Sequence, residues 1–341
     1  MHSKRIQWLD FAKGLTIFFV VICHSIVTNP NLSFQNNLSL IAMGTVDTFI
    51  MPIFFSISGF LYHRVTSIRQ FGILIYKKLT SLLIPYLFFS IFDVYLLESR
   101  PALADYCRII WQPLSYLWFL YTLLLIFILV GGFDLLKIPP RVQLILALIL
   151  AIFQTRITWW DGSNFSINPI ASTLGYLIFF ELGIFLNKDS VRKYLKSGFG
   201  SQFWGLILLF VILMIIQLKI TGIGYNPDQV SVVDLSTKLL SVIIGFMIAT
   251  NFWRNRCFNY FTYYGRYTLV IYLVHYPIVH FFHILLAGLS NNFILLETVL
   301  DLFFAWGLSI MFCRGLGHSG VLKFVFYPRH YVNLLLMKIF S

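Results

Sequence analysis

Charged residues are scarce in this chain. Asp, Glu, Lys and Arg make up 11% of its 341 residues, against roughly 25% in a soluble globular domain. This scarcity excludes an ordinary soluble protein, and no long polar block is present that could form a separate soluble domain. Hydrophobic residues make up 59% of the chain instead. We therefore predict an all-α integral membrane protein that forms a single bundle of helices.

Cysteine is equally scarce, with four residues and no CxxC pair. Their wide spacing excludes a zinc-finger pattern and a disulfide framework. The spacing most like that of metal ligands is His280 and His283, one helical turn apart. However, no carboxylate accompanies them in the sequence, and His275 would project about 140° away from His280 on a helix. The sequence therefore predicts no bound metal.

Long apolar runs are what the sequence has in abundance. Runs of about 20 residues cross the hydrocarbon core of a bilayer. We count about ten, at 7–27, 45–63, 79–97, 116–133, 142–157, 170–186, 202–220, 238–253, 267–287 and 293–313. The first begins with positive charges, as a signal peptide does, but its length and lack of a small-residue cleavage site predict an uncleaved span. We expect a membrane domain over residues 1–319 and a cytoplasmic, interfacial tail over 320–341.

The chain has 13 acidic and 25 basic residues, which give a net charge of +12. The positions of the basic residues along the chain predict how it crosses the membrane. With the N-terminus inside, most of the Lys and Arg residues fall in cytoplasmic segments and few in external ones. This asymmetry predicts that both termini are cytoplasmic. Because the basic residues are spread over several separate segments, they do not form a nucleic-acid-binding patch, and we expect no nucleic-acid partner.

The first predicted span contains three ionisable side chains, Asp10, Lys13 and His24. Lys13 and His24 lie about three turns, or roughly 16 Å, apart and project in nearly the same direction, with Asp10 within about 60° of both. Alone, each has an ordinary explanation, such as an ion pair between Asp10 and Lys13 and a packing role for His24. Three such groups on one face favour a functional site facing the bundle interior or a wet cavity.

Other polar residues in predicted spans leave alternatives open. Thr268, Tyr272 and His275 share one stripe of the ninth span, which suits either packing or a role in a site. Ser58 lies among small residues that let helices approach closely. Acidic residues in or near spans are Asp47, Asp93, Glu181 and Asp301; one of the three aspartates could hold His24 or His275 in a chosen tautomer.

Several motifs occur in an order that resembles acyltransferase family 3, the bacterial integral-membrane O-acyltransferases. Leu9-Asp10 followed by Lys13-x10-His24 is similar to the opening signature of that family. The later matches are FFSISGFLYHR (54–64), YKKLTSLLIPY (76–86), LWFL (117–120) and YGRYTLVIYLVHYPI (264–278). Two positions depart from the family pattern. Ser81 stands where many members have arginine, and Lys13 replaces the commoner arginine, which gives up bidentate contact with phosphate.

The resemblance implies an O-acyltransferase of the bacterial cytoplasmic membrane. It would move an acyl group, acetyl by expectation, from cytoplasmic acetyl-CoA to a hydroxyl of a cell-surface polysaccharide or lipid-linked sugar. The expected catalytic residues are His24 and Asp10, with Asp10 orienting Lys13. The expected contacts of the donor phosphates are Lys13, Arg64, Lys77 and Lys78. The expected substrate or supporting residues are Ser58, Trp118, Tyr272 and His275.

Some relatives carry a C-terminal hydrolase-like domain that completes transfer. Here we expect transfer to finish inside the membrane domain or on a separate protein. The expected partners are acyl-CoA, the glycan or lipid-linked acceptor and membrane lipids, and a homodimer is left open. The alternative hypothesis is a transporter or flippase of a glycolipid or small anion, since buried ions and ten spans would suit that function too.

Overall fold

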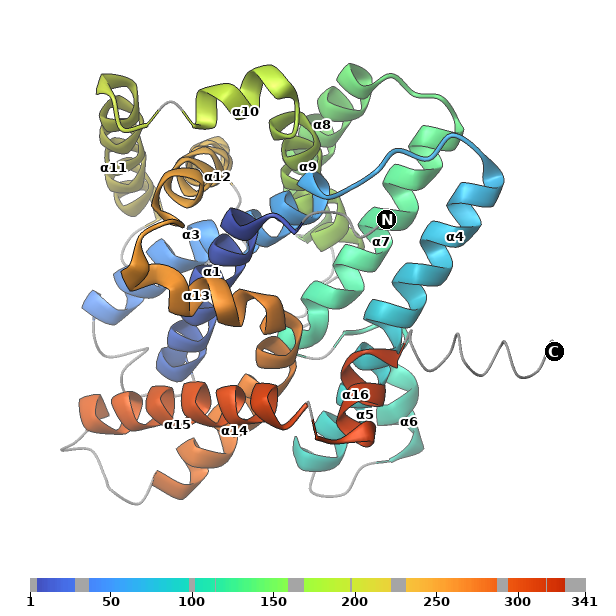
Figure 1. Cartoon of the computed structure of the whole chain (residues 1–341), viewed down its shortest axis with the longest axis vertical. Coiled ribbons are helices and arrows are strands. Elements are labelled where there is room, and N and C mark those ends of the chain that lie inside the picture. Colours follow the sequence, from blue (N-terminus) through green and yellow to red (C-terminus); the bar gives the residue numbers. More distant parts are fainter. Residues whose placement is uncertain are drawn as a thin grey trace. The chain divides into compact units, whose positions relative to one another are not determined.

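The computed structural model describes residues 5–27, 37–97, 102–113, 115–158, 169–196, 198–221, 231–286, 294–316 and 318–328. Every regular element within these ranges is a helix (Figure 1). The long helices are α1 (Gln7–Val27), α3 (Asn37–Phe60), α5 (Ile84–Leu97), α7 (Trp118–Leu135), α8 (Pro140–Thr158), α9 (Pro169–Leu186), α11 (Ser201–Thr221), α12 (Val232–Phe252), α14 (Thr268–Leu286) and α15 (Ile294–Gly315). The short ones are α4 (Ile68–Lys78), α6 (Leu103–Arg108), α10 (Asp189–Leu195), α13 (Asn259–Tyr264) and α16 (Gly320–Phe326).

The helices confirm an all-α integral membrane protein. Within the described part of the chain, nine helical stretches are long and apolar enough to cross a membrane. The remaining predicted span falls on α8, where the apolar helix Pro140–Gln154 is shorter than the other nine. Every run predicted from the sequence thus coincides with a helix.

The third span begins earlier than the sequence predicts. Instead of starting at residue 79, a continuous helical run extends over Ile68–Tyr95. It consists of α4, a π-helical turn at Leu79–Leu83 and α5. The side chain of Ser67 caps the start of α4 by accepting a hydrogen bond from the backbone of Gln70. The charged residues of α4 hide this helix from a search for apolar runs, because such a search detects hydrophobicity rather than helicity.

Contacts within the chain divide it into two compact units. The first unit comprises residues 1–61 and 182–312, and the second comprises 62–181 and 313–341. In the first unit, α1 packs against α3, α12, α13 and α14, and α11 packs against α12. In the second unit, α4 packs against α7, and α16 packs against α5, where the rings of Phe326 and Phe89 lie 5.7 Å apart. The predicted tail thus begins as a packed helix, and residues 329–341 lie outside the described part.

Two glycines allow α1 to approach the residues that precede α14. A Cβ atom on Gly14 would lie 1.9 Å from the carbonyl oxygen of Phe261. A Cβ atom on Gly265 would lie 1.7 Å from the carbonyl oxygen of Asp10. Real Cβ atoms essentially never come within 3.0 Å of another heavy atom. Only glycine therefore fits at either position, and this contact fixes the part of α1 that carries Asp10 and Lys13.

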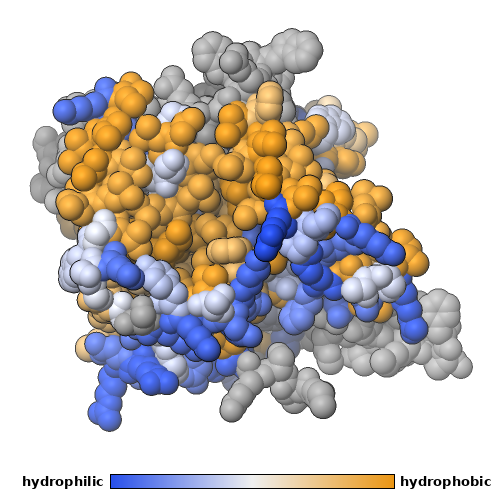
Figure 2. Space-filling model, turned by 90° about the horizontal axis from the view of Figure 1, so that it is seen from above, coloured by the Kyte–Doolittle hydropathy of each residue, from blue (hydrophilic) through white to orange (hydrophobic). Residues whose placement is uncertain are grey.

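The surface of the first unit includes a helix suited to lipid. α11 exposes a row of large apolar side chains, among them Trp204, Leu208, Ile212 and Ile215. Figure 2 shows hydrophobic side chains over much of the face in view. A soluble monomer rarely exposes an apolar patch of this extent. The exposure therefore agrees with a helix that faces the hydrocarbon of a bilayer.

Candidate functional site

The first unit brings two histidines together from distant parts of the sequence. His24 lies near the C-terminal end of α1, and His275 lies in α14. The centroids of their imidazole rings are 5.1 Å apart. Tyr276 packs edge-on against His24 at 5.2 Å, and the ring of Tyr272 lies 5.9 Å from that of His275. Three of the residues predicted for the site, His24, Tyr272 and His275, thus form one cluster.

The backbone of α14 defines which nitrogen of His275 carries hydrogen. Nδ1 of this fully buried residue lies 2.7 Å from the carbonyl oxygen of Tyr272 and 3.1 Å from that of Ile271. Carbonyl oxygens only accept hydrogen bonds, so Nδ1 must donate, and in a neutral ring the lone pair then resides on Nε2. The sequence suggested that an aspartate could select this tautomer, whereas backbone carbonyls one turn earlier do so.

At the N-terminal end of α1, Asp10 forms its ion pair with a residue other than the expected Lys13. Asp10 is buried, and its Oδ2 accepts a hydrogen bond of 2.7 Å from Nε of Arg5. Lys13 is half-buried and forms no ion pair with any residue in the described ranges. The direct ion pair of Asp10 is therefore with Arg5 and not with Lys13, as one interpretation of the sequence had it. Asp10 also lies about 21 Å along the helix axis from His24, too far to contact it.

A second polar cluster, centred on Asp134, lies in the second unit. Oδ2 of Asp134 accepts hydrogen bonds from the Tyr62 hydroxyl at 2.8 Å and the Val65 backbone at 3.1 Å. Oδ1 accepts from Arg64 at 3.2 Å and from Gln143 at 3.1 Å. Burial, and then the hydrogen bond to this carboxylate, raise the pKa of Tyr62, so its phenol remains a donor. This role of Asp134 was not predictable from the sequence, because the four donors come from a loop and from a different helix.

The cations predicted to bind donor phosphates in this unit differ in their surroundings. Arg64 is held by Asp134, with 34% of its side chain exposed. The Nζ atom of Lys78 lies 3.6 Å from the centroid of the Phe127 ring, and that ring packs edge-on against Phe180. Lys77, the next residue on the helix, is exposed. Since successive helical residues project about 100° apart, only Lys78 turns toward α7.

The other two predicted supporting residues, Ser58 and Trp118, make contacts of their own. The hydroxyl of Ser58 donates to the carbonyl oxygen of Phe54 in its own helix, at 3.0 Å. This bond agrees with the packing interpretation of Ser58. Trp118 belongs to the second unit, where its ring lies 5.2 Å from that of Tyr176.

The first unit also contains a basic cavity that the sequence did not predict. It has a volume of about 350 Å³. Its lining residues are Gln7, Trp253, Arg254, Asn259, Thr262, Tyr263 and Arg266. The guanidinium groups lie over aromatic rings, Arg254 at 5.2 Å from Trp253 and Arg266 at 5.9 Å from Tyr263. Gln7 places the cavity at the start of α1. Arginines interleaved with aromatic residues in "WRNR" and "YYGRY" were the available signal.

The fold is that of a multi-pass membrane protein, and its first unit contains a pair of neighbouring histidines. A family model described as an acyltransferase domain (Acyl_transf_3) matches residues 6–315. The chain therefore belongs to the acyltransferase 3 family and is a membrane acyltransferase, as the sequence motifs predicted. No curated protein and no solved structure matches the chain significantly.

Proposed function

We propose that this acyltransferase moves an acetyl group from cytoplasmic acetyl-CoA to a hydroxyl of a cell-surface polysaccharide or lipid-linked sugar, in a bacterial cytoplasmic membrane. The observation that carries the proposal is the pair His24 and His275, with ring centroids 5.1 Å apart. Imidazole is the side chain most often used as a general base near neutral pH. Two of them inside a membrane domain suit proton transfer better than packing alone.

In the proposed reaction, His24 removes the proton from the sugar hydroxyl as its oxygen attacks the carbonyl carbon of the thioester. The new carbon–oxygen bond forms, the carbon–sulfur bond breaks, and the proton passes from His24 to the departing CoA sulfur. The products are an acetyl ester and free CoA. His275 is proposed as a positioning residue, because its Nδ1 is occupied by the Tyr272 carbonyl and its Nε2 can accept a hydrogen bond.

Donor binding requires cations, since CoA carries several phosphate groups. Lys13, Arg64, Lys77 and Lys78 remain the contacts proposed from the sequence. The ion pair with Asp134 reduces the charge that Arg64 can offer to a phosphate. Within the first unit, which also carries Lys13, we propose Arg254 and Arg266 as further contacts of the donor. Their guanidinium groups can contact phosphate bidentately, and the neighbouring Trp253 and Tyr263 offer faces for a purine.

The proposal is tested by comparing the surface glycans of a strain lacking this gene with those of its parent by mass spectrometry. We expect acetyl groups to be lost from one glycan and to return when the gene is restored. Identical acetylation in both strains would contradict the proposed acceptor. Failure of the purified protein to bind acetyl-CoA would contradict the proposed donor and favour the transporter hypothesis.

A further inference from the structure

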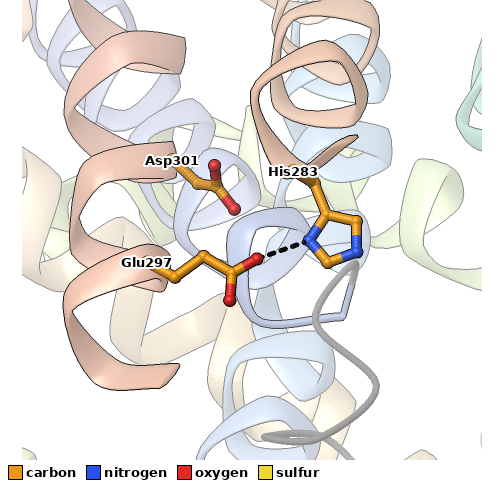
Figure 3. A group of neighbouring side chains, drawn as sticks. All are labelled: His283, Glu297 and Asp301. Carbon is orange, nitrogen blue, oxygen red and sulfur yellow. Dashed lines mark ion pairs between the residues drawn. The ribbon is translucent and has the colours of Figure 1, made fainter. Parts of the chain in front are cut away.

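Three side chains of the kinds that bind metal ions meet where α14 ends and α15 begins, within the first unit. They are His283 of α14 and Glu297 and Asp301 of α15, and both carboxylates project toward the imidazole (Figure 3). Nδ1 of His283 lies 3.1 Å from Oε1 of Glu297, and one ligand atom from each residue lies within 4.8 Å of the others. The sequence predicted no metal because no carboxylate accompanies His283 locally. The carboxylates come instead from the following helix, where an (i, i+4) spacing puts both on one face.

The burial of Asp301 requires an explanation that the described residues do not supply. Its side chain is 0% exposed, and neither carboxylate oxygen has a hydrogen-bond partner among the described residues. Glu297 is also buried, at 8% exposed, and pairs with His283. A buried carboxylate is unfavourable unless it is paired with a cation or coordinates a metal ion. Two buried carboxylates side by side also repel one another. A divalent cation between them would attract both and so offset this repulsion.

We propose that His283, Glu297 and Asp301 bind a divalent transition-metal ion, either Zn²⁺ or Mn²⁺. One imidazole nitrogen with carboxylate oxygens suits these ions, whereas Mg²⁺ and Ca²⁺ prefer ligand sets made of oxygen alone. Bonds of about 2.1 Å allow two ligand atoms of one ion to lie at most about 4.2 Å apart. The present spacing of up to 4.8 Å closes with a small rotation of a side chain.

The proposed ion would join the end of α14 to the start of α15. His283 lies two turns of α14 beyond His275, about 12 Å along the axis, so the ion is not part of the transfer centre. By fixing the end of α14, it would instead hold the helix that carries His275. This inference rests on the cluster alone and does not depend on the proposed acyl transfer.

The test uses the full-length protein purified without a polyhistidine tag, because such a tag would itself bind metal. Metal content is measured by mass spectrometry of the elements, and the EDTA-treated protein is then titrated with Zn²⁺, Mn²⁺ and Mg²⁺ while its thermal unfolding is followed. We expect Zn²⁺ or Mn²⁺ to bind saturably and raise the unfolding temperature, and Mg²⁺ to have a much smaller effect. An absence of saturable binding of Zn²⁺ and Mn²⁺ would overturn the proposal, whatever the variants do.

Single substitutions then test whether the ion binds at these three residues. Asp301→Asn keeps the shape of the side chain and removes its charge. Asp301→Asn and His283→Ala should each weaken metal binding at least tenfold, since even residues that only support metal ligands have effects of this size. The matched controls are Asp189→Asn, an exposed aspartate paired with Arg192, and His318→Ala, an exposed histidine. Both should bind like the wild type. Wild-type affinity in Asp301→Asn would overturn the site.

Discussion

The imidazole rings of His24 and His275 lie 5.1 Å apart, although one residue belongs to the first span of the chain and the other to the ninth. Their proximity depends on the packing of α1 against α14 and the residues before it. At Gly14 and Gly265 the two segments meet backbone to backbone, with no room for a Cβ atom. The histidine pair and the two glycines therefore belong to one structural arrangement.

Gly14→Ala tests this arrangement. The new methyl group would meet the carbonyl oxygen of Phe261 at 1.9 Å, so α1 must move away. We expect a loss of about 3 kcal/mol or more in the free energy of unfolding, at the upper end for overpacked positions. Thermal or denaturant unfolding in detergent measures this loss. The matched control is Gly72→Ala in α4, where nothing lies within 4 Å of the new Cβ. It should leave stability unchanged or raise it by about 0.5–1 kcal/mol, and an equal loss in both variants would contradict the account.

Asp134→Ala tests the polar cluster of the second unit. The substitution removes the acceptor of Tyr62, Val65, Arg64 and Gln143 together. We expect a loss of about 2–4 kcal/mol in the free energy of unfolding, reduced from the value for a fully buried ion pair because Arg64 is 34% exposed. Denaturant titration would measure it. Asp189→Ala, which removes an exposed ion pair, should lower the free energy of unfolding by less than about 1 kcal/mol. A similar small effect for Asp134→Ala would show that the cluster contributes little.

Donor binding should depend on the basic cavity and on Lys13. Arg254→Ala, Arg266→Ala and Lys13→Ala should each weaken acetyl-CoA binding about tenfold or more, because a charge-assisted contact contributes roughly 1.5–3 kcal/mol. Lys13→Arg should bind better than Lys13→Ala, since it retains the charge. Calorimetric titration with acetyl-CoA measures these affinities. Arg141→Ala, at an exposed position of α8, is the control and should bind normally. Normal binding by the two arginine variants would remove the cavity from the donor site.

The predicted topology has its own test. Reporter fusions after Lys193 should report cytoplasm, and fusions near Asn164, which lies outside the described residues, should report the exterior. These expectations follow from the distribution of Lys and Arg over the loops. The two positions flank α9, so the same result for both would mean that α9 does not cross the membrane.

The sequence predicted the spans well, because apolar length identifies a span without any tertiary information. Helical periodicity also puts Lys13 and His24 on one face of the first span, and their role in a site stays a prediction. The tautomer of His275 was not predictable, because it depends on backbone carbonyls whose availability is a property of the folded helix. Neither was the direction of Lys78, which follows from α4, the helix at the start of the third span that the apolar pattern did not predict.

Contacts between helices were beyond the sequence for a different reason. Asp134 gains its four donors, and His283 its two carboxylates, only when loops and neighbouring helices pack together. A pattern within one helix contains no information about the side chains of the next. The glycines at 14 and 265 were visible as residues, but the backbone contact that requires them was not.

The most direct test of the account is the activity of His24→Ala. In a strain lacking the chromosomal gene, wild-type protein and the control His318→Ala should restore acetyl groups to the surface glycan. His24→Ala should reach the membrane in normal amounts, because removing a polar group from a span does not hinder insertion, and should bind acetyl-CoA almost normally. Mass spectrometry of the glycan should find no acetyl ester in that strain. Wild-type acetylation by His24→Ala would contradict the assignment of the histidine pair as the centre of transfer.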